Sequence, residues 1–254
     1  MKFLRSLPAA VIFVLLTVTF TSAQYRGPDP ATTQARAAAD PTFYLPTEPT
    51  PNLGLLKNRL RDYADCAAAS ACYARDLDAQ TARASVLLDA AVAHSKPGEK
   101  LALVLDIDET SLSNLEEMEH DDFGYISQDF NAWVVTAKAP AIPGTLRLFN
   151  QALSLGVKVY FITGRDESQR VATIDNLTSA GYHGWQSLSM QPASSGAASS
   201  KPFTVAVYKS AERGKIVAAG YRIVMNVGDQ LSDLDGDPHA DFSIRLPNPF
   251  YYLP

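Results

Sequence analysis

Short hydrophobic runs recur along the second half of the chain, and stretches with helical periodicity separate them. The runs cover residues 101–105, 157–162, 221–227 and 242–246. The first three are continuously apolar, as expected of strands buried on both faces, whereas the fourth alternates, as in an edge strand. The helical stretches span about residues 143–155, 167–180 and 210–219. This alternation of strands and helices predicts an α/β fold, with a parallel sheet and helices on both of its faces.

Two further helices are predicted ahead of the sheet. Asn52 is a good N-cap, and apolar residues after it recur at intervals of three and four, which defines one helical face. A second helix, rich in Ala and Leu, runs from about residue 73 to 94 and stops before a Pro-Gly pair. We therefore expect a small helical N-terminal cap element over 52–98 and the α/β core over 99–254.

Residues 1–23 have the features of a secretory signal peptide. Lys2 and Arg5 precede an apolar run, which small residues close at Ala23. A membrane anchor is the alternative, but Pro8 and the shortness of the uninterrupted run argue against it. The expected product is an exported protein, periplasmic or secreted, with no stable membrane anchor.

The segment 24–51 is predicted to be a linker or an arm lying on the surface, because prolines interrupt it throughout. These prolines are Pro28, Pro30, Pro41, Pro46, Pro49 and Pro51.

The whole chain of 254 residues is acidic, with a formal net charge of -5. Loss of residues 1–23 would remove Lys2 and Arg5, and would leave 20 basic residues (22 minus 2) against 27 acidic ones. This excess of acidic residues argues against a protein whose main function is to bind a nucleic-acid polymer. Two cysteines are too few for a disulfide scaffold, and they do not form the C-x-x-C pair of a zinc ribbon.

The two cysteines, Cys66 and Cys72, lie between the two predicted N-terminal helices. In an exported chain they are expected to form a disulfide that staples the helix–helix turn. Closing so short a loop is worth about 2 kcal/mol in the chain-entropy model. The alternative is two free buried thiols, since the pair could fall within one continuous helix, where the two sulfurs would lie on different faces.

Each apolar strand is followed by a cluster of polar residues. Asp106 and Asp108 follow the first strand, Thr163 and Gly164 the second, and Asp229 the third. In an open parallel sheet ligands bind at the carboxyl ends of the strands, so these residues are expected to meet. Carboxylates so close repel one another unless a cation lies among them, and a hard divalent cation, most simply Mg²⁺, suits oxygen ligands. The alternative is that the acids only begin loops and cap helices.

With Mg²⁺ at the site, a phosphate is the natural substrate. Asp106 closes its strand and is the expected nucleophile, forming an acyl phosphate that water hydrolyses. Asp108, two residues on, is expected to protonate the leaving oxygen and then to deprotonate the attacking water, while its carbonyl ligates the metal. Thr163 and the N–H of Gly164 offer donors to the phosphate oxygens.

Three more residues complete the predicted site. Lys209, expected at the start of the helix before the third strand, would supply a fixed positive charge, although a lysine there is often a solvated surface group. Asp229 would complete the metal shell, and Asp233 would hold Asp229 or a metal-bound water. Both aspartates could instead cap and begin a following helix.

The order Asp-x-Asp-x-Thr, Thr-Gly-Arg, Lys and Gly-Asp-x-x-x-Asp resembles the haloacid dehalogenase (HAD) superfamily of phosphohydrolases. Five stretches look like the exported acid phosphatases of the class B/class C group, and the branch with plant acid phosphatases and vegetative storage proteins looks most similar. They are VLDIDETSLSN (104–114), TGRDES (163–168), YKSAER (208–213), GYRIVMNVGDQLSDL (220–234) and RLPNPFYYLP (245–254). The resemblance implies a Rossmann-like, HAD-like core that hydrolyses small-molecule phosphomonoesters.

Residue by residue, the resemblance implies that Asp106 is the nucleophile and Asp108 the acid/base. It implies that Thr163 and Lys209 bind phosphate, and that Asp106, the Asp108 carbonyl and Asp229 bind Mg²⁺. Storage members of the family can lack the nucleophile, and this chain keeps it, which favours an active enzyme. The alternative is a catalytically weak storage or phosphate-ligand binding protein on the same fold.

Aromatic residues between 111 and 142 are candidates for framing the substrate. They could stack a nucleobase or an aryl leaving group, or they could pack the core of the cap. They are Phe123, Tyr125, Phe130 and Trp133. His120 could donate to the leaving group, or it could be a surface histidine.

Overall fold

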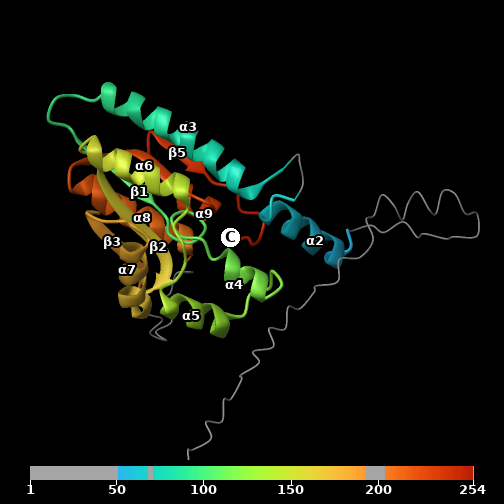
Figure 1. Cartoon of the computed structure of the whole chain (residues 1–254). Helices are drawn as coiled ribbons and strands as arrows, with labels where there is room; N and C mark the ends of the chain where they lie inside the picture. The colour runs from blue at the N-terminus through green and yellow to red at the C-terminus, as the bar shows by residue number, and fades with distance from the viewer. Residues whose placement is uncertain (1–50, 68–70, 193–203, 254) are drawn as a thin grey trace, which may run out of the picture. The chain divides into compact units, whose positions relative to one another are not determined.

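Within the described residues, five strands form one parallel sheet in the order β3-β2-β1-β4-β5 (Figure 1). The strands are β1 (Lys100–Leu105), β2 (Lys158–Asp166), β3 (Ser187–Gln191), β4 (Tyr221–Gly228) and β5 (Phe242–Arg245). The four predicted strands are confirmed, and β5 lies at an edge, as its alternating pattern indicates. The sequence did not predict β3, at the other edge, because only Leu188 and Met190 of its five residues are buried and polar residues surround them.

The computed structural model describes residues 51–67, 71–192 and 204–253, which belong to one compact unit, Thr50–Pro254. The expected signal peptide over 1–23 and nearly all of the arm over 24–51 lie outside the described residues, so both stay predictions. No helix in the described ranges has both the length and the apolar character that crossing a membrane requires.

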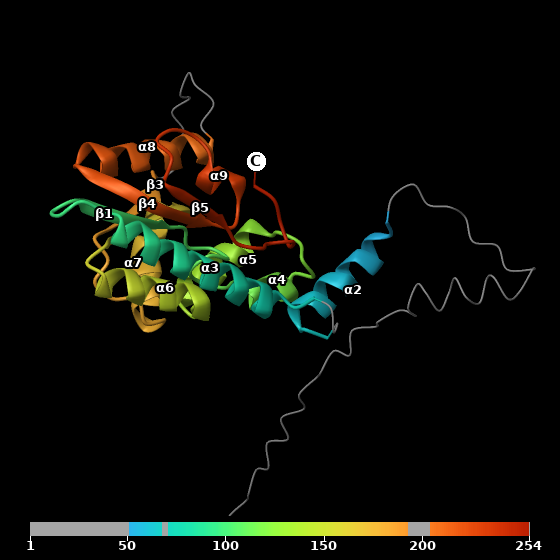
Figure 2. The same cartoon turned by 90° about the horizontal axis from the view of Figure 1, so that it is seen from above.

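Helices cover both faces of the sheet, as predicted. Figure 2 shows α8 and α9 on one side and α3, α6 and α7 on the other. The helices are α2 (Leu53–Ala64), α3 (Tyr73–Ala93), α4 (Leu115–His120), α5 (Ser127–Thr136), α6 (Pro143–Ser154), α7 (Arg170–Ser179), α8 (Val205–Ala218) and α9 (Leu231–Leu234), with a 3₁₀ turn, η1 (Glu167–Gln169), before α7. The central strand β1 shows why both faces must be covered. Its residues 101, 103 and 105 join the larger hydrophobic cluster with α3 and α6, whereas Ala102 and Val104 join the smaller one with Tyr208 and Ile216 of α8.

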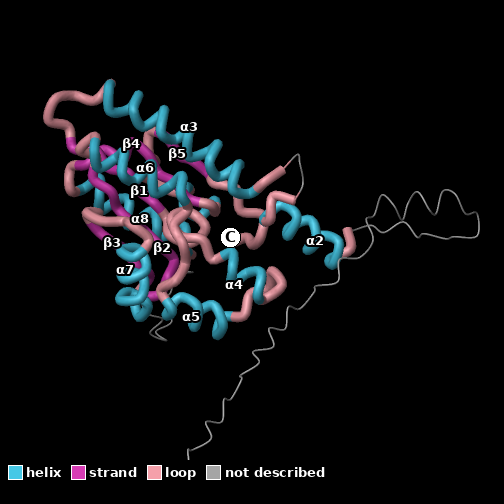
Figure 3. The backbone as a smooth tube through the Cα atoms, viewed as in Figure 1, coloured by secondary structure: helices cyan, strands magenta, loops and turns pink. Residues whose placement is uncertain are grey.

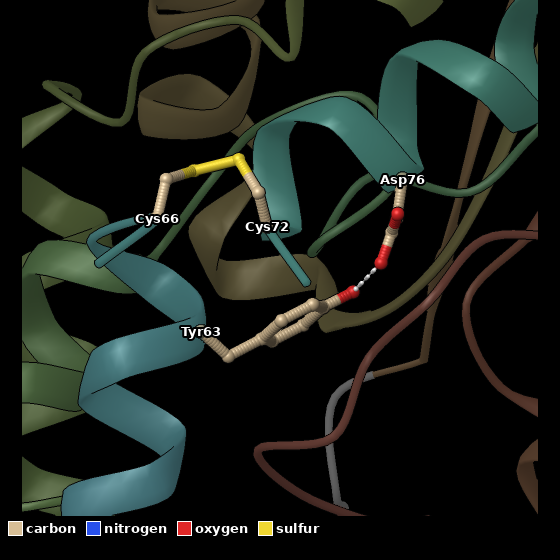
Figure 4. The surroundings of a disulfide bond; sticks show 4 residues. All are labelled: Tyr63, Cys66, Cys72 and Asp76. Atoms are coloured by element: carbon tan, nitrogen blue, oxygen red, sulfur yellow. Dashed lines mark hydrogen bonds between the residues drawn. A yellow bond between two sulfur atoms is a disulfide. The ribbon is translucent and has the colours of Figure 1, made fainter. Parts of the chain in front are cut away.

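The two N-terminal helices are separate, and a disulfide joins them. Asn52 caps α2, since its side-chain oxygen accepts hydrogen bonds from the backbone N–H groups of Gly54 and Leu55. The Cys66–Cys72 disulfide spans the turn, and beside it the Tyr63 hydroxyl donates to Asp76 over 2.8 Å (Figure 4).

The buried side of α3 packs on the sheet. Leu77, Ala84 and Leu88 belong to the larger hydrophobic cluster, together with residues of β1. No residue of α2 is fully buried. The division of this region into a cap over 52–98 and a core over 99–254 stays a prediction.

One helix begins earlier than the sequence predicts. The predicted helix covered about residues 210–219, but α8 begins at Val205, where the hydroxyl of Thr204 accepts from the N–H of Val207. The sequence missed this cap because a valine-rich first turn lacks clear helical periodicity. Lys209 therefore lies one turn inside the helix rather than at its start.

The loops that follow β1, β2 and β4 gather at one end of the sheet, beside α4 and α5 (Figure 3). This is the carboxyl end of the parallel strands, where the polar clusters were expected to meet.

Candidate active site

Three buried aspartates form the floor of the site. Carboxylate oxygens of Asp106, Asp229 and Asp233 all lie within 4.8 Å of one another. Asp106 follows β1, Asp229 follows β4, and Asp233 lies in the short helix α9, so segments far apart in the sequence supply the three groups. The expected convergence of the strand ends therefore occurs.

Lys209 reaches this floor from α8 and is buried there. Its Nζ donates to Asp106 Oδ1 over 2.5 Å and also to Asp233. Burial alone would lower the pKa of Lys209, but the two carboxylates raise it above its usual value. Burial raises the pKa of Asp106 well above its ordinary value, against the pull of Lys209. The alternative of a solvated surface lysine does not apply.

The floor suits a hard divalent cation. Three carboxylates face one ammonium group, so a negative charge remains if all are ionised, and every potential ligand is an oxygen. Lys209 donates to Asp106 and Asp233, whereas Asp229 is held by neutral donors. The residues present therefore fit the expected Mg²⁺.

Asp229 accepts hydrogen bonds on both of its oxygens. Thr110 donates to Oδ1 over 3.2 Å, while the side-chain amides of Gln230 and Asn248 donate to Oδ2 over 2.6 and 2.7 Å. Burial, followed by the charge of Asp233, raises the pKa of Asp229 to about 6, and the two amides oppose this shift. The orientation of this carboxylate is thus set before any ligand arrives.

Asp108 turns its carboxylate toward Arg165. Arg165 donates to it from Nε (3.1 Å) and Nη2 (2.7 Å), and the Asn114 amide adds a hydrogen bond of 2.8 Å. Burial would raise the pKa of Asp108, but the ion pair and these hydrogen bonds lower it below its usual value. Asp108 is therefore a fixed carboxylate beside the floor, close to a buried cation.

Asn114 connects Asp108 with a second buried acid, Glu109. The backbone N–H and side-chain amide of Asn114 donate to Glu109 over 2.5 and 3.1 Å, and its Oδ1 accepts from Trp133 Nε1 over 2.9 Å. The Tyr251 hydroxyl also donates to Glu109 over 2.9 Å. Burial, with the charges of neighbouring aspartates, raises the pKa of Glu109 to about 8.

The predicted phosphate-binding pair lies at the end of β2. Gly164 is exposed and lines the cavity over the site. Thr163 is fully buried, and its hydroxyl accepts from the backbone N–H of Arg165 over 3.1 Å. Gly164 thus lines the cavity, whereas the Thr163 hydroxyl holds the backbone of the last residues of β2, where the register of the strand shifts.

A cavity of about 550 Å³ opens above these groups. Aromatic and aliphatic side chains form its outer wall: Met118, Phe123, Tyr125, Ile126, Phe130, Val205, Phe250, Tyr251, Tyr252 and Leu253. Glu117 and Asp121 at α4 add negative charge to this wall. The site therefore has a charged floor and a largely apolar opening.

The four candidate aromatics do not share one role. Phe123, Tyr125 and Phe130 line the cavity, whereas Trp133 points to Asn114. Phe123 already stacks on Phe250, with ring centroids 5.6 Å apart and planes 8° apart. His120 is a surface residue, since its side chain is 76% exposed and pairs with Asp121.

Several residues of the site were not assigned a role from the sequence: Glu109, Asn114, Arg165, Asn248 and Tyr251. The first three stand within or beside the predicted motifs, so their positions were visible but their partners were not. Asn248 and Tyr251 fall within the stretch RLPNPFYYLP that carries part of the family resemblance, but its letters do not indicate their partners, because they reach Asp229 and Glu109 only through the fold.

Comparison with known proteins identifies the family. The sequence model described as HAD superfamily, subfamily IIIB (Acid phosphatase) matches residues 36–254, which is most of the chain. The chain belongs to this family. The parallel five-stranded sheet with helices on both faces is accordingly a HAD-like fold.

Relatives in plants include an acid phosphatase and vegetative storage proteins. Acid phosphatase 1 of Solanum lycopersicum is 39% identical over 153 residues, which cover 59% of this chain and 58% of the tomato protein. Vegetative storage protein 1 of Arabidopsis thaliana is 34% identical over 158 residues, covering 59% of this chain and 55% of the relative. The matched region is thus less than two thirds of these relatives' length.

A solved structure supports the same assignment. The class C acid phosphatase from Bacillus anthracis has a TM-score of 0.59 and 25% sequence identity, covering 78% of this chain and 86% of that chain. The same class C enzyme with tungstate bound has a TM-score of 0.58.

Proposed function

We propose that this member of the subfamily IIIB acid phosphatases hydrolyses phosphate monoesters through an aspartyl-phosphate on Asp106. The observation that carries the proposal is the meeting of Asp106, Lys209 and two further aspartates at the bottom of a cavity wide enough for an organic leaving group. Family membership supports the same reaction class.

In the first step a carboxylate oxygen of Asp106 attacks phosphorus, and the bond to the ester oxygen breaks. Asp108 gives a proton to the departing alkoxide or phenoxide. The negative charge of an incoming phosphoryl group repels the ionised carboxylate of Asp108, and its oxygens compete with Asp108 for the Arg165 guanidinium. Both effects raise the pKa of Asp108 and favour its protonated form. In the second step Asp108 takes a proton from water, which attacks phosphorus and releases inorganic phosphate and free Asp106.

The other site residues stabilise the transferred group. Lys209 is positioned to neutralise a phosphoryl oxygen, since its Nζ already binds the attacking carboxylate. The N–H of Gly164, which lines the cavity, is the proposed donor to one remaining oxygen, and the Thr163 hydroxyl, which accepts from Arg165 but retains its own proton, is the proposed second donor. Tungstate is a tetrahedral oxyanion like phosphate, so the tungstate complex of the class C relative supports an oxyanion site in this family.

Mg²⁺ would be held by Asp106, Asp229 and the carbonyl oxygen of Asp108, with Asp233 supporting the arrangement through Lys209. When bound, it supplies positive charge that orients and neutralises the phosphoryl oxygens. The buried oxygen donors of the floor support this choice over a metal that prefers nitrogen or sulfur.

The outer wall favours aryl phosphates or nucleoside monophosphates as substrates. Tyr125 and Phe130 line the opening and lie near each other, with ring centroids 5.8 Å apart, so a flat leaving group can pack against them. Export is proposed from the sequence of residues 1–23, and the Cys66–Cys72 disulfide suits an oxidising compartment.

The test is hydrolysis of p-nitrophenyl phosphate by the chain without residues 1–23, in mildly acidic buffer with Mg²⁺. We expect activity in the wild type and its loss in Asp106→Asn. Asp175→Asn, the same change at an exposed position of α7, is the matched control and should keep full activity. A wild type inert toward aryl, sugar and nucleoside phosphates with every divalent metal tried would refute the proposal.

A storage or phosphate-ligand binding protein is the second candidate, because vegetative storage proteins are among the relatives. The retained Asp106 favours the enzyme. A wild type that binds inorganic phosphate but hydrolyses no phosphomonoester would favour the second candidate.

A further inference from the structure

The eight residues after β5, 246–253, form a strap that crosses the site. Figure 2 shows this segment running from β5 toward the start of α3 and α4. Leu246 and Phe250 anchor the strap, because both side chains are buried. Phe250 packs edge-on against Tyr73 of α3, with ring centroids 5.0 Å apart, and stacks on Phe123 after α4.

One side chain of the strap contacts the floor of the site directly. The Nδ2 of Asn248 donates to Asp229 Oδ2 over 2.7 Å. The other end of the same amide is fixed, since Asn248 Oδ1 accepts from the backbone N–H of Phe250 over 3.0 Å. The amide can therefore present only its NH₂ group to Asp229.

The strap also holds the second amide that binds this carboxylate. Gln230 donates to Asp229 Oδ2 over 2.6 Å, and its Oε1 accepts from the backbone N–H of Leu253 over 3.0 Å. Both donors on Asp229 Oδ2 thus depend on the strap for their orientation.

A third contact of the strap is with Glu109, which follows Asp108 in the chain. The Tyr251 hydroxyl donates to Glu109 Oε2 over 2.9 Å, although the two residues are 142 positions apart. Glu109 in turn shares Asn114 with Asp108. The strap therefore contacts the hydrogen-bonded networks of both Asp229 and Asp108.

We propose that the strap positions Asp229 for the divalent cation, and that Asn248 is its principal positioning residue. The inference rests on the proposed function, which makes Asp229 a metal ligand. Lys209 orients Asp106 and Asp233, whereas the orientation of Asp229 depends on the neutral donors that bind it. Donors that bind a metal-ligating carboxylate hold it in the rotamer that faces the ion. Without Asn248, Oδ2 of Asp229 retains only the donor from Gln230, so the carboxylate is held less firmly in the orientation that faces the ion.

The experiment measures binding of Mn²⁺ alone, by the loss of the free-ion signal in electron paramagnetic resonance, so that it does not depend on turnover. Asn248→Ala should bind Mn²⁺ about 10 to 100 times more weakly than the wild type, which is typical for loss of such a partner. Asn248→Ser keeps a short donor and should lie between the two. Asn150→Ala removes an exposed amide of α6 and should leave binding unchanged.

Activity assays then separate positioning from general damage. For Asn248→Ala, excess Mg²⁺ should restore most of the kcat for p-nitrophenyl phosphate, with the metal needed for half-activation raised by a similar factor. Circular dichroism checks that each variant is folded. If Asn248→Ala is unfolded, the comparison is made with Asn248→Ser instead. Mn²⁺ binding within twofold of the wild type in a folded Asn248 variant would overturn the inference. A wild type that binds Mn²⁺ but hydrolyses nothing would instead overturn only the proposed function.

Discussion

Replacing Lys209 by methionine keeps most of the volume of the side chain and removes its charge. In the structure Lys209, Asp106 and Asp233 have side chains that are only 6%, 7% and 3% exposed. Removing one partner of a buried ion pair leaves an uncompensated charge and costs about 3 to 5 kcal/mol. For a chain of this size, such a loss lowers Tm by about 10 °C.

Urea unfolding in EDTA, followed by circular dichroism at neutral pH, measures this cost. Saturating Mg²⁺ should recover more stability in Lys209→Met than in the wild type, because a bound cation takes over the missing positive charge. Adding Asp233→Asn to Lys209→Met removes one of the two stranded carboxylates, and should recover part of the lost free energy of unfolding.

Lys215→Met is the matched control, since it makes the same change in the same helix. The Lys215 side chain is 71% exposed and pairs with Glu212 three residues earlier, so its loss should cost less than about 0.5 kcal/mol. If Lys209→Met in EDTA is as stable as Lys215→Met, the argument from buried charge is wrong.

Three further predictions address separate parts of the molecule. Arg165→Gln should lower the free energy of unfolding in EDTA by about 3 kcal/mol at neutral pH. Because Arg165 lowers the pKa of Asp108, the difference in stability between wild type and variant should narrow as pH falls through the lowered pKa and the carboxyl protonates. A stability difference that stays constant down to acidic pH would contradict this prediction. Cys66→Ser with Cys72→Ser should cost about 2 kcal/mol in a urea titration without reductant, and an unchanged midpoint would show that the staple adds no stability. Among para-substituted phenyl phosphates of matched leaving-group acidity, those with a carboxylate should have a higher KM than neutral ones, because the acidic cavity wall repels them. Glu117→Gln should reduce this difference in KM, and equal KM values for both classes of substrate in the wild type would refute a role for the charge of the wall.

The amino-acid sequence determined the architecture because strands and helices are encoded by short, local patterns of apolar residues. A strand buried on both faces must be continuously apolar, and a helix must show its period, so β1, β2 and β4 and most helices follow from short windows of sequence. The floor of the site was predictable for the same reason. Parallel strands end at one edge of the sheet, so the residues that follow them meet whatever the details of packing.

Local patterns failed where a segment is short or polar. Strand β3 buries only Leu188 and Met190, and its place beside β2 depends on pairing with that strand. The first turn of α8 was missed, and the sequence left open whether Lys209 is a site residue or a solvated lysine, because a window of sequence contains no information on what a side chain will meet across the sheet.

Tertiary structure alone decided which partner each charged group has. Arg165 and Asp108 are 57 positions apart, and Tyr251 and Glu109 are 142 apart, so no spacing rule connects them. Asn248 reaches Asp229 only because β5 pairs with β4 and directs the strap back across the site. The sequence determined which chemical groups are present at the strand ends, since secondary structure is encoded locally. Their ion pairs, orientations and pKa values depend on burial and contacts that exist only once the chain has folded.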